Sequence, residues 1–148
     1  MKKILVIAAH PDDEVLGAGG VIAKSSSDGH EVHVLIVAEG LTSRGQADKK
    51  DLSNLHGAAQ KAGEILGAKS VELLTLPDNR LDSIDLLDLI KPIEERIDSL
   101  SPHTVYTHHS HDVNIDHKLI QQAVITATRP VPSQPVKELF YFEEKEKV

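Results

Sequence analysis

Short apolar runs alternate with longer amphipathic segments along this chain. The apolar runs are rich in aliphatic and β-branched residues, which is typical of strands that are covered on both faces. They lie at residues 3–9, 31–39, 70–76, 104–107 and 136–142. Strands separated by helical segments favour a mostly parallel sheet. The pattern predicts a Rossmann-like three-layer αβα sandwich of the α/β class, with a mostly parallel sheet of about five strands.

Helices are predicted between these strands, at residues 13–27, 51–67, 81–100 and 116–127. The segment from Leu81 to Leu100 has apolar residues at helical spacing, so it should be one core-facing helix. Pro92 lies inside this segment and predicts a kink or break near Ile90 and Lys91. The first helix contains glycines at positions 17, 19 and 20, which we attribute to close packing, because a P-loop lysine is missing.

The first strand ends in a cluster of ionisable residues, His-Pro-Asp-Asp-Glu at positions 10–14. Burying such groups at a sheet edge is costly without a partner such as a metal ion. His10 and Asp13 are three residues apart across a turn and could converge on one ion. Asp12 would point elsewhere and could act as a base. The simpler explanation is that Asp13 and Glu14 only stabilise the N-terminus of the following helix, where the helix dipole favours negative charge.

The composition narrows the chemistry. With 148 residues, the chain should form one domain. Its net charge of −7 argues against binding nucleic acid through the phosphate backbone. There is no cysteine, so a transition metal must use histidine and carboxylate ligands, which suits zinc among others. No run is long enough to span a membrane and the N-terminal run is too short for a signal peptide, so we expect a cytoplasmic protein.

A second cluster follows the fourth strand, where five of the nine histidines lie between residues 103 and 117. Parallel strands end at the same edge of a sheet, so this cluster should lie near the first one. His117 stands at or just inside the next helix and can face back toward His10 and Asp13. The histidines at 108, 109 and 111 are each more often structural or exposed than functional.

The two clusters, together with the loop Thr42-Ser43-Arg44, resemble the PIG-L / LmbE-like family of zinc-dependent N-acetylglucosaminyl deacetylases. The resemblance spans residues 4 to about 117. It implies a zinc enzyme that hydrolyses the N-acetyl group of an N-acetylglucosamine-type sugar or glycoconjugate. The implied zinc ligands are His10, Asp13 and His117, with a water as the fourth ligand. Asp12 would take the proton of the attacking water.

The resemblance also implies supporting residues, with one departure. Arg44 and Asp78 would contact the substrate. Relatives carry a histidine where this chain has Asn114, which can donate a hydrogen bond but cannot protonate an amine. His111 is the candidate replacement as the acid for the leaving group.

Two further acids complete the implied site. Asp116, and with it Glu14, would support the ligands as neighbouring carboxylates that orient them. Relatives continue beyond the point where this sequence stops, so residues 1–148 are interpreted as a single deacetylase-like domain that is short at its C-terminus. The charged tail from residue 143 is expected to fray.

Two other functions stay open. One is a degenerate relative that binds a metal or sugar without catalysis, and metal analysis with an amidase assay separates it from an enzyme. The other is a metal-dependent phosphoesterase, which the few lysines and arginines near the predicted site disfavour. The expected partner is a small N-acetylated sugar, and the sequence leaves a homo-oligomer open.

Overall fold

The computed structural model describes residues 1–41, 45 and 48–144. Strands and helices alternate along this part of the chain, as the hydrophobic pattern predicts. The elements are β1 (Lys3–Ala8), α1 (Asp13–Ser27), β2 (Glu31–Ala38), α2 (Lys49–Leu66), β3 (Ser70–Leu76), the 3-10 helix η2 (Leu81–Ser83), α3 (Leu86–Leu100), β4 (Thr104–His108), α4 (Ile115–Ala127) and β5 (Glu138–Phe142).

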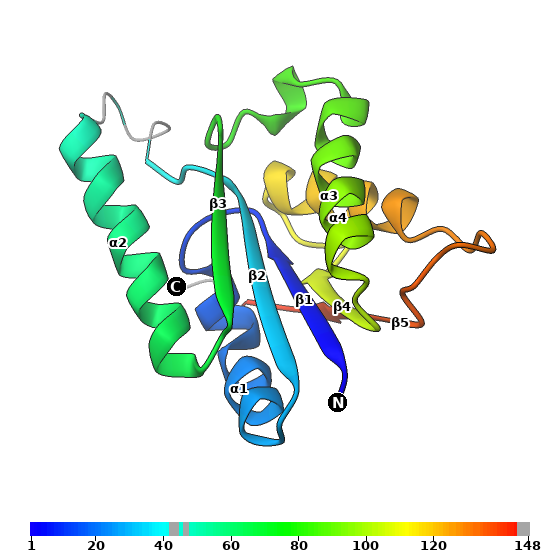
Figure 1. The fold of residues 1–148 in the computed structure, drawn as a ribbon. Helices are drawn as coiled ribbons and strands as arrows, with labels where there is room; N and C mark the ends of the chain where they lie inside the picture. The colour runs from blue at the N-terminus through cyan, green and yellow to red at the C-terminus, as the bar shows by residue number, and fades with distance from the viewer. Residues whose placement is uncertain (42–44, 46–47, 145–148) are drawn as a thin grey trace.

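The five strands form one parallel sheet in the order β3-β2-β1-β4-β5. The predicted α/β fold is confirmed, and the sheet is parallel throughout its described strands. Ile4 of β1 pairs with Val32 of β2 on one side and with Thr104 of β4 on the other. Because all strands run the same way, their carboxyl ends meet at one edge. Figure 1 shows this edge above the strand arrowheads.

Helices cover both faces of the sheet, so there are two apolar layers (Figure 1). The helices α1 and α2 pack on one face through residues such as Ile22 and Ala59. The helices α3 and α4 pack on the other face through residues such as Ile93 and Ile120. The inner strands β1 and β2 have buried residues on both faces. This explains why their sequences are continuously apolar and do not alternate between apolar and polar residues.

Gly17 shows why a glycine interrupts the first helix. A Cβ atom added at this position would lie 2.2 Å from the ring of Phe142 in β5. The close-packing explanation therefore holds at Gly17, where α1 meets the edge strand. It does not hold at Gly20, where an added Cβ would meet nothing within 4 Å.

The single helix predicted over residues 81–100 is wrong in its first part. The chain forms the short helix η2, becomes extended at Ile84, and begins α3 only at Leu86. Pro92 lies inside α3, so the interruption falls earlier than predicted. The short helix is held by a tertiary contact, because the Leu81 N–H donates to the buried Asp116 carboxylate across 3.1 Å. Periodicity cannot reveal such a contact.

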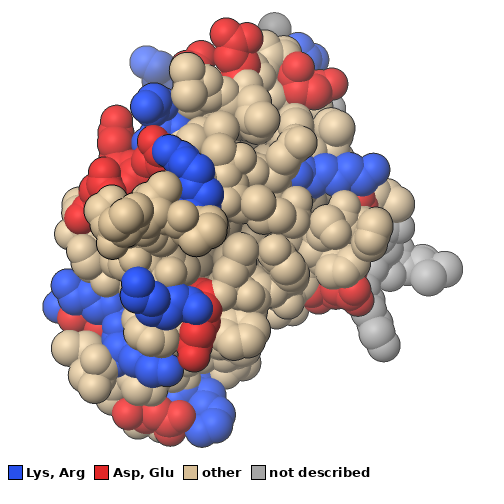
Figure 2. Space-filling view, turned by 90° about the vertical axis from the view of Figure 1, so that its right-hand side faces the viewer, with Lys and Arg blue, Asp and Glu red and all other residues tan. Residues whose placement is uncertain are grey.

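Figure 2 shows the face of the molecule on the α3, α4 and β5 side. Acidic and basic side chains are interspersed there around a broad uncharged area. No helix in the described part of the chain combines the length and the apolar character needed to cross a membrane.

Candidate metal centre

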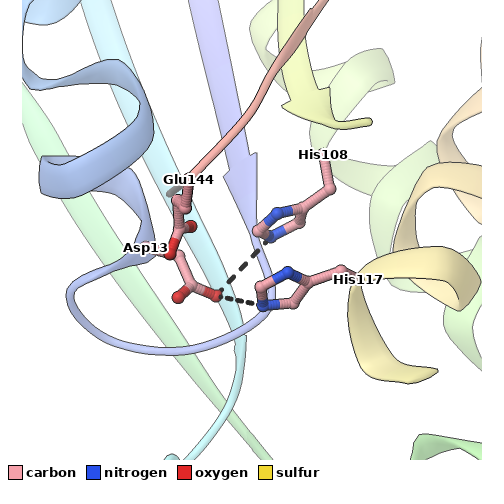
Figure 3. Close-up of side chains that lie close together, drawn as sticks. All are labelled: Asp13, His108, His117 and Glu144. Atoms are coloured by element: carbon pink, nitrogen blue, oxygen red, sulfur yellow. Dashed lines mark ion pairs between the residues drawn. The ribbon is translucent and has the colours of Figure 1, made fainter. Parts of the chain in front are cut away.

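The two clusters seen in the sequence meet at the carboxyl edge of the sheet. Asp13 begins α1, His108 ends β4, and His117 lies in the first turn of α4. Glu144 reaches the same place from the segment that follows β5. Figure 3 shows these four side chains pointing toward one another, and their ligand atoms all lie within 4.8 Å of each other.

The Asp13 carboxylate is the centre of the cluster and is only 8% exposed. Its Oδ2 atom lies 3.2 Å from His10 Nδ1 and 3.0 Å from His117 Nε2. The backbone N–H of His10 also donates to it across 3.0 Å. Burial alone would raise the pKa of Asp13, but the hydrogen bonds with the His10 and His117 imidazoles outweigh it and lower the pKa. Asp13 is therefore an anion held among imidazoles.

The His10 ring is held at its other nitrogen by two acids. His10 Nε2 lies 2.7 Å from Asp116 Oδ2 and 3.1 Å from Asp78 Oδ1. Burial favours the neutral ring, but hydrogen bonds to Asp116 and Asp13 outweigh it and raise the pKa of His10 to about 10. The ring therefore presents Nδ1 to Asp13 in a fixed orientation.

His117 is arranged in the same way from the opposite side. Its Nδ1 atom lies 2.8 Å from Asp112 Oδ2, and its Nε2 atom faces Asp13. Burial lowers its pKa, and the hydrogen bonds to Asp13 and Asp112 more than offset that and raise it. Two imidazoles thus have one nitrogen bound to an outer carboxylate and the other directed at Asp13. This is the usual arrangement of histidine metal ligands.

Asp116 is fully buried and its carboxylate has three partners. Besides His10, it accepts the backbone N–H groups of Asn79 at 2.6 Å and Leu81 at 3.1 Å. The carboxylate is therefore placed where it can orient the His10 imidazole. Its role in supporting a metal ligand stays a prediction.

His108 belongs to the cluster, although each histidine at the exit of β4 is, taken singly, more often structural or exposed than functional. Its ring stacks on that of His117, with centroids 3.8 Å apart. Its Nε2 atom accepts the backbone N–H of Ala9 across 2.9 Å, although it also lies 3.6 Å from Asp13. Burial, and then the neighbouring His117 charge, lower the pKa of His108 to about 3. We therefore interpret His108 as a neutral ring that positions His117.

Asp12 lies beside the cluster, with an exposed side chain. Its backbone has φ 102° and ψ −32°, a conformation that side chains rarely adopt and that costs about 1–3 kcal/mol. Its N–H donates to the buried Glu14 carboxylate across 2.9 Å, and burial raises the pKa of Glu14 to about 7. Glu14 thus supports the strained turn rather than the imidazoles.

Asn114 is held in a helix cap, whereas His111 is exposed. Asn114 caps α4, because its Oδ1 atom accepts the Asp116 N–H at 2.9 Å and its Nδ2 atom donates to Asn79 at 3.1 Å. Both ends of this amide are therefore engaged. His111 is exposed, and its ring centroid lies 5.3 Å from that of His109. Their predicted roles in catalysis stay predictions.

Asp78 and Arg44 are the two residues predicted to bind the substrate. Asp78 is 3% exposed and faces His10, so it can act on a substrate only through that ring or after a rearrangement. Arg44 lies outside the described residues. Both assignments stay predictions.

Glu144 is the residue that the sequence reasoning missed. The tail was expected to fray from residue 143, but Glu144 is half-buried within the cluster. Burial, and then the Asp13 charge, raise the pKa of Glu144 to about 8. The rule that parallel strands end at one edge applies to β5 as well, and it would have placed the first acids after that strand here.

The donor set fits a divalent metal. It consists of imidazole nitrogens and carboxylate oxygens, which suit zinc, and it contains no lysine or arginine. Within the described residues, the buried Oε1 atom of Glu144 has no hydrogen-bond partner, which is costly for a carboxylate without a cation.

Comparison with known sequences identifies relatives with a named activity. Residues 5–128 match the family PIG-L, described as GlcNAc-PI de-N-acetylase. The chain is 31% identical over 136 residues to the uncharacterized deacetylase YaiS of Escherichia coli, covering 88% of this chain and 70% of the relative. It is 27% identical over 140 residues to a probable N-acetyl-alpha-D-glucosaminyl L-malate deacetylase 2 of Bacillus cereus, covering 90% of this chain but only 64% of that protein.

Solved structures share the fold. The conserved protein TT1542 from Thermus thermophilus matches all of this chain and 69% of its own, with a TM-score of 0.81 at 23% identity. The 4-carboxy-2-hydroxymuconate hydratase GalB from Pseudomonas putida is 30% identical and has a TM-score of 0.70, covering 86% of this chain and 57% of its own.

Proposed function

Since the chain belongs to the PIG-L family of GlcNAc-PI de-N-acetylases, we propose that it is a metal-dependent hydrolase that removes the N-acetyl group from an N-acetylglucosamine-type sugar or glycoconjugate. One observation carries this proposal. Two imidazoles, each bound to a carboxylate at its outer nitrogen, direct their inner nitrogens at the Asp13 carboxylate.

The proposed metal ligands are His10 through Nδ1, Asp13 through its carboxylate, and His117 through Nε2. His108 is left out because its Nε2 lone pair already accepts the Ala9 N–H. Three protein ligands of this kind are typical of a catalytic zinc site. A zinc ion held by these three residues would supply a Lewis acid, which would lower the pKa of a bound water and polarise a carbonyl.

The remaining residues would move protons and hold the sugar. Asp12 has an exposed carboxylate next to the ligands and would take the proton of the attacking water. When the C–N bond breaks, the amine needs a proton, for which His111 is our candidate donor. Asn114 would act by fixing the start of α4. Arg44 would contact the sugar, and Asp78 would contribute through His10.

A hydratase is the second candidate, supported by two observations. GalB is 30% identical to this chain. In addition, the amide of Asn114 is engaged in capping, so this position offers no acid to protonate an amine. Addition of water across a carbon–carbon double bond has no amine leaving group, and the proton that a base takes from the water can be returned to the other carbon of the double bond.

A paired assay separates these candidates. The purified protein with added zinc is incubated with N-acetylglucosamine and its glycosides, and separately with an unsaturated carboxylic acid, before and after treatment with a chelator. We expect acetate release that is lost on chelation and restored by zinc, and none from the His117→Ala variant. Hydration without acetate release favours the hydratase. Metal binding without either reaction contradicts both and favours the non-catalytic binding domain.

A further inference from the structure

We propose that Glu144 is a fourth protein ligand of the metal centre and closes its open coordination position. The inference rests on the metal site of the proposed function. It concerns a residue outside the two sequence clusters that define that site. Its support comes from position, burial and charge.

The position of Glu144 is the first argument. One of its carboxylate oxygens lies within 4.8 Å of the ligand atoms of Asp13, His108 and His117. Figure 3 shows the side chain entering from the segment after β5 and reaching Asp13, beside which His108 and His117 lie. Glu144 thus reaches Asp13 from a different element than those that carry His10, His108 and His117.

The anchoring of the preceding strand is the second argument. Phe142 is 7% exposed, its carbonyl accepts the His109 N–H at 3.1 Å, and its ring packs edge-on against His108 at 4.8 Å. The missing side chain of Gly17 makes room for that ring. Only one residue separates Phe142 from Glu144, so the edge strand delivers this carboxylate to the cluster.

The charge balance is the third argument. Glu144 brings a second carboxyl group next to Asp13 and forms a hydrogen bond with it, while its Oε1 atom is buried without a partner among the described residues. Two carboxylates in a poorly solvated place repel each other, and a buried polar oxygen without a partner is costly. A dication bound between them and the imidazoles removes both costs. A proton shared by the two acids is the competing explanation.

The assignment has a consequence for access to the site. A catalytic zinc site keeps one position open for water, whereas four protein ligands close it, so the attacking water of the proposed reaction could bind only after Glu144 has left. A hollow of about 260 Å³ lies on the outer side of Glu144 and is also lined by His111 and Asp112. A substrate carbonyl that enters from this hollow would have to displace the Glu144 carboxylate.

The test compares zinc affinity in Glu144→Gln and Glu144→Ala with the parent and with Glu143→Gln as the control. Glu143 is the adjacent acid, its side chain is 75% exposed, and it lies 3.7 Å from His109. Its removal changes the net charge equally without touching the cluster. We expect both Glu144 variants to bind zinc at least about 10- to 100-fold more weakly, the loss typical of an outer-shell partner, and Glu143→Gln to match the parent.

Cobalt provides a second readout that does not depend on activity. In the cobalt-loaded protein, the visible absorption spectrum should change in Glu144→Gln and stay the same in Glu143→Gln. Parent-like zinc affinity and spectrum in Glu144→Gln would establish the shared proton and overturn the assignment. A parent that binds no metal overturns this inference together with the proposed function. A parent that binds metal but releases no acetate overturns only the proposed reaction.

Discussion

The two sides of Asp13 are built differently. On the His10 side, the imidazole rests on Asp116 and Asp78, which are 0% and 3% exposed. By contrast, Asp12 and His111 are exposed, and Glu144 is half-buried at the border of a hollow. The buried side has the fixed hydrogen bonds that hold a metal-binding imidazole in one orientation. The exposed side has the freedom that proton transfer and substrate entry need.

The largest effect should come from the exposed side, at Asp12. Asp12→Asn removes the proposed base but keeps the side-chain shape, so turnover should fall by about 10²–10⁴-fold. Zinc content should not change, because Asp12 is not among the proposed ligands. Acetate release and metal analysis of the same samples provide the measurement, with Asp13→Asn as the matched comparison. If Asp12→Asn strips the metal and Asp13→Asn retains it, the two roles are exchanged.

A smaller effect is expected on the buried side, at Asp116. Asp116→Asn keeps the size but replaces one oxygen by an amide nitrogen. His10 and the Asn79 N–H share Oδ2 whereas the Leu81 N–H uses Oδ1, so the single oxygen of asparagine cannot serve all three partners. Loss of a partner that orients a ligand typically weakens metal binding by about 10–100-fold. Zinc titration measures this loss. Equal zinc affinity in Asp116→Asn and the parent would show that the orientation of His10 does not depend on this carboxylate.

The smallest effect tests how the edge strand is held against α1. Gly17→Ala places a methyl group in the Phe142 ring, and overpacking of this kind costs about 1–3 kcal/mol. Gly20→Ala, in the same helix with open space around it, should instead stabilise by about 0.4–1 kcal/mol. Chemical denaturation of both variants gives the comparison. Equal stability changes in both would mean that Phe142 moves aside freely.

The sequence was sufficient for the sheet and for part of the cluster. Five apolar runs predict the strands, and the rule that parallel strands share an edge brings Asp13 and His117 together from distant segments. Sequence spacing cannot give ring orientation. His108 and His111 have similar sequence surroundings, but the Ala9 N–H and the His117 ring bind the former, whereas the latter faces solvent.

The remaining misses have the same physical origin. The short helix before Ile84 is tied to Asp116 through the Leu81 N–H, and Glu144 is placed by the packing of Phe142 on Gly17. Each contact joins residues far apart in the chain. Local propensity and periodicity contain no information on them.

The three partners of Asp116 couple the cluster to the segment before α3. The carboxylate that holds His10 also holds the amide protons of Asn79 and Leu81. A change that moves Asp116 away from these two amides exposes them to solvent and speeds their hydrogen exchange. Because Asp116 also holds the His10 ring, the exchange rates at Asn79 and Leu81 report on the position of that ring. The amide signal of Leu81 in two-dimensional NMR spectra should therefore change while metal is added.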